Sequence, residues 1–415
     1  MQDTSRPIVL ISGAGVAGPA LAFWLERCGI EPVLIETAPT LRTDGYMIDF
    51  WGVGYDVAEI MGLLPQLKRL SYDMSEVRFV DDAGRTAGGF SADLLRSAVG
   101  GRYFSIPRSD LAGEIYRSLE GRVETIFGDS ITSIEQDDAA VRVTFHHAAP
   151  RQVDLVIGAD GLHSRVRQLV FGPEADFEKY LGYYVASFTV EGYPHRDEGD
   201  FVSYGVPGRQ IARYALRGNR TAFFFNWAED RKLPFDHRDV VAQKELLAQR
   251  FGGAGWETDA ILAMLPSCSD LYFDSVSQIR MDRWSTGRVA LLGDAAFCPS
   301  LLAGQGTAFA MIAAYVLAGE LDRAHGDFAR AFKNYDTTLR TFIESKQQSA
   351  SRFGSWLVPR TKGGLFLRNQ VTRLMSLPFV GDWMMRSAFS DNFTLPGYRI
   401  GRAAPNASAG QGAAS

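Results

Sequence analysis

Apolar and polar positions near the start of the chain follow two different periods. Residues 8–12 and 31–36 are short apolar runs typical of buried strands, and residues 17–28 between them carry apolar side chains at helical spacing. A strand, a helix and a second strand within about 30 residues predict a βαβ unit with parallel strands. A second helix is predicted over residues 55–70. Residues 38–54 are too irregular for us to assign an element.

The pattern changes in the middle of the chain. Short alternating runs between residues 123 and 158 predict three or four strands. Aromatic-rich runs between residues 180 and 275 predict a mostly antiparallel sheet, separate from the parallel one, and one helix at 240–251 interrupts them. A buried strand within 287–296 and a helix over 306–321 then return to the first kind of pattern, and the remainder is mainly helical.

These patterns predict an α/β domain with a parallel sheet, an inserted and mostly antiparallel sheet domain, and a C-terminal helical region. The last residues are small and polar, as is typical of disorder. The expected boundaries are 1–71, 101–175 and 279–350 for the first domain, 72–100 and 176–278 for the inserted domain, 351–400 for the C-terminal helices and 401–415 for a disordered tail.

Charge and composition exclude several classes of protein. Lys and Arg number 43 against 48 Asp and Glu, a net charge of −5, so the basic footprint of a nucleic-acid-binding protein is absent. The widely spaced Cys28, Cys268 and Cys298 favour a reducing, cytoplasmic compartment over a disulfide framework, and the six histidines lack metal-ligand spacing. No signal-peptide pattern and no run of about 18 apolar residues occurs, so we expect no membrane insertion.

The stretch SGAGVAGPA joins the first strand to the first helix. Gly13 would allow the tight turn, and Gly18 would allow the helix to pack closely on the strand. Gly15 would let a pyrophosphate approach the backbone next to Ala17. Glu36 ends the second strand, where its carboxylate can accept hydrogen bonds from ribose hydroxyls. The stretch favours an adenine dinucleotide over an incidental glycine-rich turn, but it does not separate FAD from NAD.

A second glycine-rich loop occurs far along the chain. A strand ends there in Gly293 and Asp294, and Gly304, Gln305 and Gly306 open a helix. NAD alone needs no second loop at this distance, whereas an extended FAD does. Asp294 can bond the ribityl chain, and the helix can direct N–H groups to the flavin edge that is negative when reduced. The alternative is a buried strand followed by a capped core helix, but FAD explains both loops together.

With both loops in place, the chain resembles the class A flavoprotein monooxygenases of the p-hydroxybenzoate hydroxylase type, and among them the compact tetracycline-inactivating enzymes. Three family motifs match in order and spacing: GAGVAG at 13–18, GADGLHSRVR at 158–167 and GDAA at 293–296. SIPRSDL at 105–111 adds to a match that extends over about residues 6–345. The resemblance implies an α/β FAD-binding fold, Rossmann-like and of the glutathione reductase type, with the inserted sheet as substrate domain.

The resemblance also implies roles for single residues. Glu36 would hold the adenosine ribose of FAD, Arg108 would reach its phosphate and ribityl region, and Asp294 would bind the ribityl chain. Asp160 would shape a loop near the pyrophosphate. Asp49 resembles a position beside the flavin ring.

Enzymes of this family use NAD(P)H and O₂ through a flavin C4a-hydroperoxide, so the resemblance implies non-covalent FAD and no catalytic side chain. With one dinucleotide loop taken by FAD, NAD(P)H would bind transiently near Arg42. The flavin ring would swing out to meet it, and Gly45, Gly52 and Gly54 would give the chain slack there. We expect a small aromatic substrate and O₂ as partners, no nucleic acid, and a monomer or homodimer.

The inserted sheet would supply a flat aromatic pocket. Rings would form its walls, and an arginine would orient a phenolate or an acid, with ordinary sheet packing as the alternative for each residue. The candidates come from the aromatic-rich strands and from the GDAA loop, where many relatives have His: Tyr204, Arg213, Tyr214, Phe223, Phe225, Trp227 and Phe297.

Rival functions remain open at this point. They are a flavin-dependent halogenase, a flavin-dependent reductase and a flavin-fold binding protein without turnover. The Trp-x-Trp-x-Ile pattern expected of tryptophan halogenases is absent. Intact motifs for both ends of FAD weigh against a binding protein. Motifs do not separate hydroxylation from Baeyer–Villiger insertion or epoxidation, nor NADH from NADPH.

Overall fold

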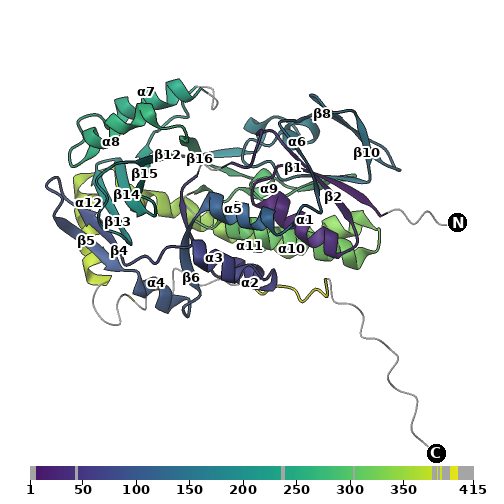
Figure 1. The fold of residues 1–415 in the computed structure, drawn as a ribbon, viewed down its shortest axis with the longest axis horizontal. Helices are drawn as coiled ribbons and strands as arrows, with labels where there is room; N and C mark the ends of the chain where they lie inside the picture. Colours follow the sequence, from purple (N-terminus) through teal and green to yellow (C-terminus); the bar gives the residue numbers. More distant parts are fainter. Residues whose placement is uncertain are drawn as a thin grey trace, which may run out of the picture.

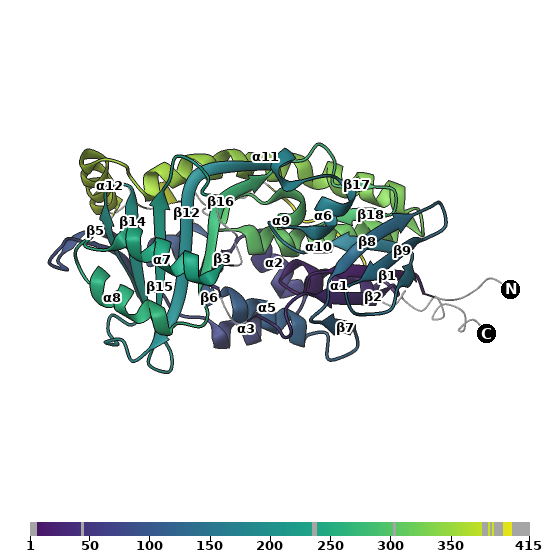
Figure 2. The same ribbon diagram turned by 90° about the horizontal axis from the view of Figure 1, so that it is seen from above.

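The computed structural model describes residues 6–42, 45–234, 239–301, 304–375, 381, 384–385 and 393–400. The tail expected over residues 401–415 lies outside the described residues. Two large sheets lie toward opposite ends of an elongated molecule (Figure 1). The long helix α11 (Phe328–Leu357) runs along the molecule between them, as the view from above shows (Figure 2).

The first sheet has six strands in the order β17-β18-β11-β1-β2-β7. Its strands are parallel except for the short β17, which pairs antiparallel with β18. The inner strands are mostly apolar and their central residues are buried, as expected for a parallel sheet that is covered on both faces. The strands are β1 (Ile8–Ser12), β2 (Glu31–Glu36), β7 (Glu124–Phe127), β11 (Leu155–Gly158), β17 (Ser285–Thr286) and β18 (Val289–Leu291).

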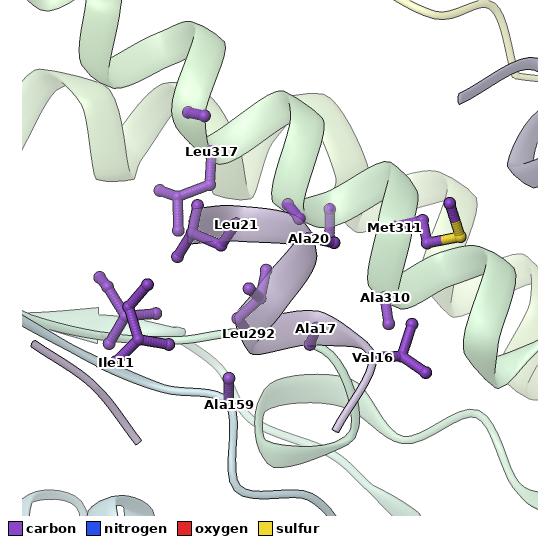
Figure 3. Close-up of a cluster of buried hydrophobic side chains, with 14 of the residues drawn as sticks. Ile11, Val16, Ala17, Ala20, Leu21, Ala159, Leu292, Ala310, Met311 and Leu317 are labelled. Carbon is purple, nitrogen blue, oxygen red and sulfur yellow. The ribbon is translucent and has the colours of Figure 1, made fainter. Parts of the chain in front are cut away.

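Two helices that are far apart in sequence pack along each other beside this sheet. Helix α1 (Ala17–Arg27) and helix α10 (Gly306–Ala324) run in the same direction (Figure 3). Ala17 lies near Ala310 at one end of the contact, and Leu21 lies near Leu317 further along. The small side chains of Ala17 and Ala310 let the helices approach closely at one end. Because the helices run in the same direction, their N-termini lie at that end.

The second sheet has seven strands in the order β16-β12-β15-β14-β13-β4-β5. All neighbours are antiparallel except β13 and β4, which are parallel. It thus includes the predicted hairpin from residues 72–100. The strands are β4 (Glu76–Val80), β5 (Thr86–Ser91), β12 (Glu178–Glu191), β13 (Asp200–Val206), β14 (Arg209–Leu216), β15 (Arg220–Ala228) and β16 (Tyr272–Ile279).

The two faces of the seven-stranded sheet have different covers. The outer face packs against α7 (Val240–Phe251), α8 (Thr258–Met264) and the 3-10 turn η2 (Leu265–Ser267). The inner face lies against the end of α11, α12 (Lys362–Met375) and strand β3 (Met47–Trp51). The inner face is therefore the one turned toward the rest of the molecule.

Smaller elements connect the two sheets. Strand β3 pairs with β6, and a three-stranded sheet in the order β10-β9-β8 packs on the core of the first domain. The remaining elements are β6 (Tyr103–Pro107), β8 (Ile131–Gln136), β9 (Val141–Phe145), β10 (Arg151–Val153), α2 (Val53–Ile60), α3 (Leu64–Leu70), α4 (Asp93–Ala98), α5 (Arg108–Arg117), α6 (Arg165–Val170), η1 (Glu174–Asp176) and α9 (Asp294–Phe297).

Some predicted elements differ from the observed ones. The helix expected over residues 55–70 is two helices, α2 and α3, because Gly62 between them has φ +76° and ends the first. The unassigned stretch 38–54 contains β3, and Gly54 is fixed in α2. A Cβ at Gly54 would lie 2.4 Å from Ala308 Cβ, so this glycine serves packing on α10 rather than slack. Helix α11 also runs unbroken through the expected boundary at 350.

Two negative findings concern the described residues only. None of their helices has both the length and the apolar character that a bilayer crossing requires. Their His, Cys, Asp and Glu side chains form no group of three or more that could hold a metal ion.

Candidate active site

The turn between β1 and α1 is built by three glycines with different surroundings. A Cβ on Gly13, which has φ +106°, would lie 2.5 Å from the Ala159 oxygen, and one on Gly18 would lie 1.9 Å from the Gly13 oxygen. Both positions therefore require glycine for packing. A Cβ on Gly15 would meet no described atom within 4 Å. Gly15 thus borders open space in front of the first turn of α1, where a ligand could approach the backbone.

Glu36 is held at the end of β2 beside this turn. Its Oε2 accepts a hydrogen bond from Ala14 N at 2.8 Å, and its Oε1 accepts one from Ala38 N at 2.9 Å. An ionised carboxylate has about four acceptor positions, so the bound Glu36 can still accept further donors such as ribose hydroxyls. The backbone bonds fix where those donors would have to lie.

Asp160 follows β11 and closes the loop that lies against Gly13. Its carboxylate accepts hydrogen bonds from Ser164 Oγ at 2.5 Å, Arg165 N at 2.8 Å and Val166 N at 3.1 Å. Burial raises the pKa of Asp160, and these hydrogen bonds oppose the rise. Its side chain is therefore engaged in starting α6, and its contribution to the site is the shape of the loop.

The second loop lies directly beside the first. Gly293 has φ +63°, and a Cβ there would lie 3.3 Å from Ala17 Cβ and 3.6 Å from Ala310 Cβ. Asp294 begins α9 and is half-buried, and a Cβ on Gly306 would lie 3.6 Å from its Oδ1. Asp294 therefore lies at the first residue of α10, next to the start of α1.

Arg108 adds a positive charge to this region. It is the first residue of α5, and its backbone N donates to Tyr46 O at 3.0 Å. Burial raises the pKa of Asp294 and the charge of Arg108 opposes the rise, so the two side chains are electrostatically coupled. The structure thus brings together Arg108 and Asp294, which are far apart in sequence.

The first turns of α1 and α10 both lack a side-chain cap, as do those of α2, α3, α4, α5, α8 and α9. Neither N-cap residue, Val16 or Gln305, accepts a hydrogen bond with its side chain, whereas Ser164, Asp239 and Asp327 cap α6, α7 and α11. Uncapped N-terminal N–H groups favour an anionic ligand. Because α1 and α10 run in the same direction (Figure 3), both sets of N–H groups lie at one end of the pair. An extended anionic cofactor such as FAD fits this arrangement.

A cavity of about 210 Å³ lies beside the second loop, between β3 and the inner face of the seven-stranded sheet. Gly304 borders it, so the cavity begins where the candidate cofactor site ends. Tyr46 forms one wall, with its ring 6.3 Å from that of Phe224 and 5.2 Å from that of Tyr272. The lining residues are Tyr46, Met47, Ile48, Asp49, Ser187, Phe201, Ala212, Arg213, Tyr214, Ala222, Phe223, Phe224, Leu301, Gly304 and Leu357.

Asp49 is the carboxylate of this cavity. Its Oδ1 accepts hydrogen bonds from Tyr103 Oη at 2.7 Å and Ser105 Oγ at 2.6 Å, both from β6. Burial raises the pKa of Asp49, and the two hydroxyl donors oppose the rise. Asp49 is thus positioned by its neighbours at the cavity wall.

Of the predicted pocket residues, Tyr214 lines the cavity, but the face chosen for β15 was wrong. Side chains alternate along a strand, and Phe223, Phe225 and Trp227 pack in a cluster with α7 and α8 on the outer face. Phe224 lies on the inner face and lines the cavity instead. Phe223 also borders the cavity, but its ring packs against Phe188 and Tyr193 in the outer cluster.

Of three further predicted pocket residues, one borders the cavity and two lie elsewhere. Arg213 borders the cavity, but its guanidinium is already paired with Asp197 at 2.6 Å. Tyr204 donates its hydroxyl to Asp82 and to the Ala254 carbonyl, outside the cavity. Phe297 is buried against Trp284 with ring centroids 4.6 Å apart, and it belongs to the core of the first domain.

Other residues near the candidate site were not predicted. They include Tyr46, Ser187 and Phe224, which line the cavity, and Tyr103, which holds Asp49. The alternation of side chains along β15 could have predicted Phe224, because every second residue of a strand that is buried on both faces points to the inner face. Arg42, predicted for the approach of NAD(P)H, is exposed after β2.

Comparisons with known proteins agree with this geometry. A family model described as FAD binding domain matches residues 7–330. A flavin-dependent monooxygenase of Legionella longbeachae is 35% identical, over 94% of this chain and 98% of that protein. Tetracycline destructase Tet(51) has a TM-score of 0.81 at 31% identity, over 95% of this chain and 100% of its own. HpxO of Klebsiella pneumoniae, complexed with FAD and uric acid, shares the fold at 22% identity, with a TM-score of 0.73 over 92% of this chain and 95% of its own.

These matches confirm the fold class that the glycine-rich loops and the inserted sheet predict. They also agree with FAD as the bound cofactor, since the matched domain spans both loops. The chain belongs to the class A flavin-dependent monooxygenases that are built on this FAD binding domain.

Proposed function

We propose that this protein is a single-component monooxygenase that uses FAD, NAD(P)H and O₂ to oxidise an aromatic or polyketide-like small molecule in the cavity. One observation carries the proposal: Gly304 belongs both to the loop before α10 and to the cavity wall. A ligand in the cavity would therefore lie at the flavin end of an FAD that extends from the start of α1. The three free cysteines fit a cytoplasmic location.

FAD, when bound, activates O₂ and delivers one oxygen atom to the substrate. The chain's residues bind and orient the cofactor. Glu36 would accept hydrogen bonds from the adenosine ribose, and the first N–H groups of α1 would hold the pyrophosphate. Asp294 would bind the ribityl chain beside Arg108. The N–H groups that open α10 would stabilise negative charge on the reduced ring.

The cavity residues would exclude water and place the substrate. Tyr46, Tyr214 and Phe224 offer flat apolar surfaces, and Asp49 offers a carboxylate. The likeness to tetracycline destructase Tet(51) supports a bulky fused-ring substrate. NAD(P)H would approach transiently from the side of Arg42, because the single dinucleotide loop is used by FAD.

The binding part of the proposal is tested at Gly15. Gly15→Ala should leave the fold intact, since its Cβ meets no described atom, but should weaken FAD binding about tenfold by holding the pyrophosphate off the backbone. The control is Gly363→Ala in α12, where an added Cβ also meets no described atom. Flavin absorbance of apo-protein titrated with FAD measures both. Unchanged affinity in Gly15→Ala would remove the assignment of this loop.

A second test compares the affinity for FAD of variants at the two acids of the site, Asp294 and Asp49. Asp294→Ala should raise the dissociation constant for FAD more than Asp49→Ala, because Oδ1 of Asp49 is already occupied by Tyr103 and Ser105. A charge-assisted bond from Asp294 to the ribityl chain contributes roughly 1.5–3 kcal/mol. Equal dissociation constants in the two variants would contradict the role given to Asp294.

Turnover tests the reaction itself. We expect slow NAD(P)H oxidation by the enzyme alone and faster oxidation with O₂ uptake once a suitable aromatic compound is added, which an oxygen electrode measures during a compound screen. NAD(P)H oxidation coupled to substrate reduction without O₂ uptake would point to a reductase. A flavin that NAD(P)H never reduces would point to a binding protein.

A further inference from the structure

The inner face of the seven-stranded sheet continues beyond the cavity. Ala212 on β14 and Phe224 on β15 lie opposite each other, and both line the cavity. Two residues further along lie Gln210 and Asn226, which are also opposite each other. Because side chains alternate along a strand, Gln210 and Asn226 lie on the same face as the cavity. They do not line the cavity itself but continue the same face of the sheet two residues beyond its wall.

These two amide side chains are buried and incompletely hydrogen-bonded. Asn226 is 0% exposed and Gln210 is 2% exposed. Gln210 Nε2 donates to Ser203 Oγ at 2.7 Å. Gln210 Oε1 and both amide atoms of Asn226 have no hydrogen-bond partner in the described part of the chain. Buried polar groups in native proteins are nearly always bonded, since an unbonded one has lost its water without compensation.

A buried guanidinium lies close to this amide pair. Arg368 on α12 is 3% exposed, and its Nη1 donates to Leu357 O at 3.1 Å, a residue of the cavity wall. A Cβ on Gly205, the β13 residue paired with Gln210, would lie 3.4 Å from Arg368 Nη2. The guanidinium of Arg368 is therefore next to both the cavity wall and the strand position that pairs with Gln210.

The charge of Arg368 has no acidic partner among the described residues. Its side chain bonds to backbone carbonyl oxygen and to Asn369 Oδ1, and it stands 4.1 Å from the ring centroid of Phe79. Burial alone lowers the pKa of Arg368 to about 10. The two other buried arginines of the described chain, Arg167 and Arg213, each form an ion pair with a carboxylate. Buried charges normally have such a partner.

We propose that Arg368, Gln210 and Asn226 form an anion subsite at the end of the cavity, which receives the carboxylate of an aromatic hydroxy acid. This inference rests on the proposed function, because the ring of the same molecule would lie in the cavity against Phe224. The carboxylate supplies the counter-charge for Arg368 and accepts from Asn226 Nδ2. A neighbouring hydroxyl of the ligand donates to Gln210 Oε1. The substrate class is thus an acid rather than a neutral ring system.

The test uses the FAD-loaded protein and a matched pair of probes, 3-hydroxy-2-naphthoate and 3-hydroxy-2-naphthamide. Calorimetry at about pH 8, where the acid is ionised, measures both dissociation constants. We expect the acid to bind about tenfold more tightly than the amide, the effect of one charge-assisted bond. Arg368→Met should abolish this preference, and Arg368→Lys should keep part of it. The matched control is Arg373→Met, on the exposed side of the same helix.

A second variant distinguishes a loss of ligand binding from a loss of folding. Asn226→Leu is of similar size and removes the unbonded amide, so its melting temperature should be equal or higher, while the acid binds about threefold more weakly. Equal binding of the two probes by the wild type, or a preference that survives in Arg368→Met, would overturn the subsite. Binding is read without turnover, so a selective wild type that never consumes O₂ would leave the subsite standing and refute the monooxygenase proposal.

Discussion

The two faces of the seven-stranded sheet bury aromatic and charged side chains in opposite ways. On the outer face, Phe225 and Trp227 pack in a closed cluster with α7 and α8, and Arg213 has carboxylates beside it. On the inner face, Phe224 borders a cavity, and Arg368 has no acidic partner among the described residues. The charge of Arg213 is therefore paired without a ligand, although Trp227 Nε1 on the same face has no hydrogen-bond partner in the described part of the chain. Burial is common to both faces, so the cavity and the unpaired charge of Arg368, rather than burial, mark the face that binds.

The largest expected effect is a difference in the free energy of unfolding between variants at two aromatic residues of β15. Trp227→Ala should lower the free energy of unfolding by about 3–5 kcal/mol, because it removes a ring packed against Tyr184 and Phe251 in a closed cluster. Phe224→Ala should cost only about 1–2 kcal/mol, because its ring already borders open volume. Denaturant unfolding at saturating FAD measures both. Equal losses would contradict the distinction between the two faces.

An intermediate effect is expected for the two buried arginines of this sheet region. Arg213→Met should destabilise the protein by about 1–2 kcal/mol, because Asp197 and Glu257 lose the buried cation that they share and keep only Arg78 and Arg196, respectively. Arg368→Met removes a buried charge that has no described acidic partner, so stability should stay unchanged or rise by about 1 kcal/mol. Melting temperatures of both variants check the contrast. A loss in Arg368→Met as large as that in Arg213→Met would mean that an acid outside the described residues neutralises it.

The smallest expected effect concerns pH and Asp49 at the cavity wall. Burial raises the pKa of Asp49 in the folded protein above its unfolded value, so the folded state binds the proton more tightly. The resulting stabilisation is present below the unfolded pKa and is lost as pH rises through the folded pKa. Asp49→Asn should therefore gain stability relative to wild type as pH rises from about 4 to 7. Melting curves at saturating FAD test this, with Asp93→Asn as the matched substitution at an exposed position.

The cofactor region could be predicted from sequence because its determinants are local. The turn, helix and strand from Ile8 to Glu36 depend on glycines and apolar runs that are adjacent in the chain, and the predicted bounds agree with β1, α1 and β2 within one residue. The break at Gly62 was missed, since helical spacing continues on both sides of it. A single positive φ, which spacing does not reveal, separates α2 from α3.

The substrate face could not be predicted in the same way. Alternation shows that Phe223, Phe225 and Trp227 share one side of β15, but not which side. That choice depends on α7 and α8 returning over the sheet, a contact between distant segments. Tyr204 was misplaced for the same reason, because its hydroxyl partners Asp82 and Ala254 lie in remote loops.

The side-by-side packing of α1 and α10 fixes the distance between their two N-termini. This distance bears on the length of the cofactor that can reach both. A Cβ added at Gly293 would lie 3.3 Å from Ala17 Cβ and 3.6 Å from Ala310 Cβ, so the small side chains at this contact hold the two helix starts close together. If the proposed function holds, a flavin mononucleotide, which has a single phosphate and no adenosine for Glu36, would engage only one of these starts, whereas a dinucleotide would engage both. The alanines of this helix contact would then favour the larger flavin.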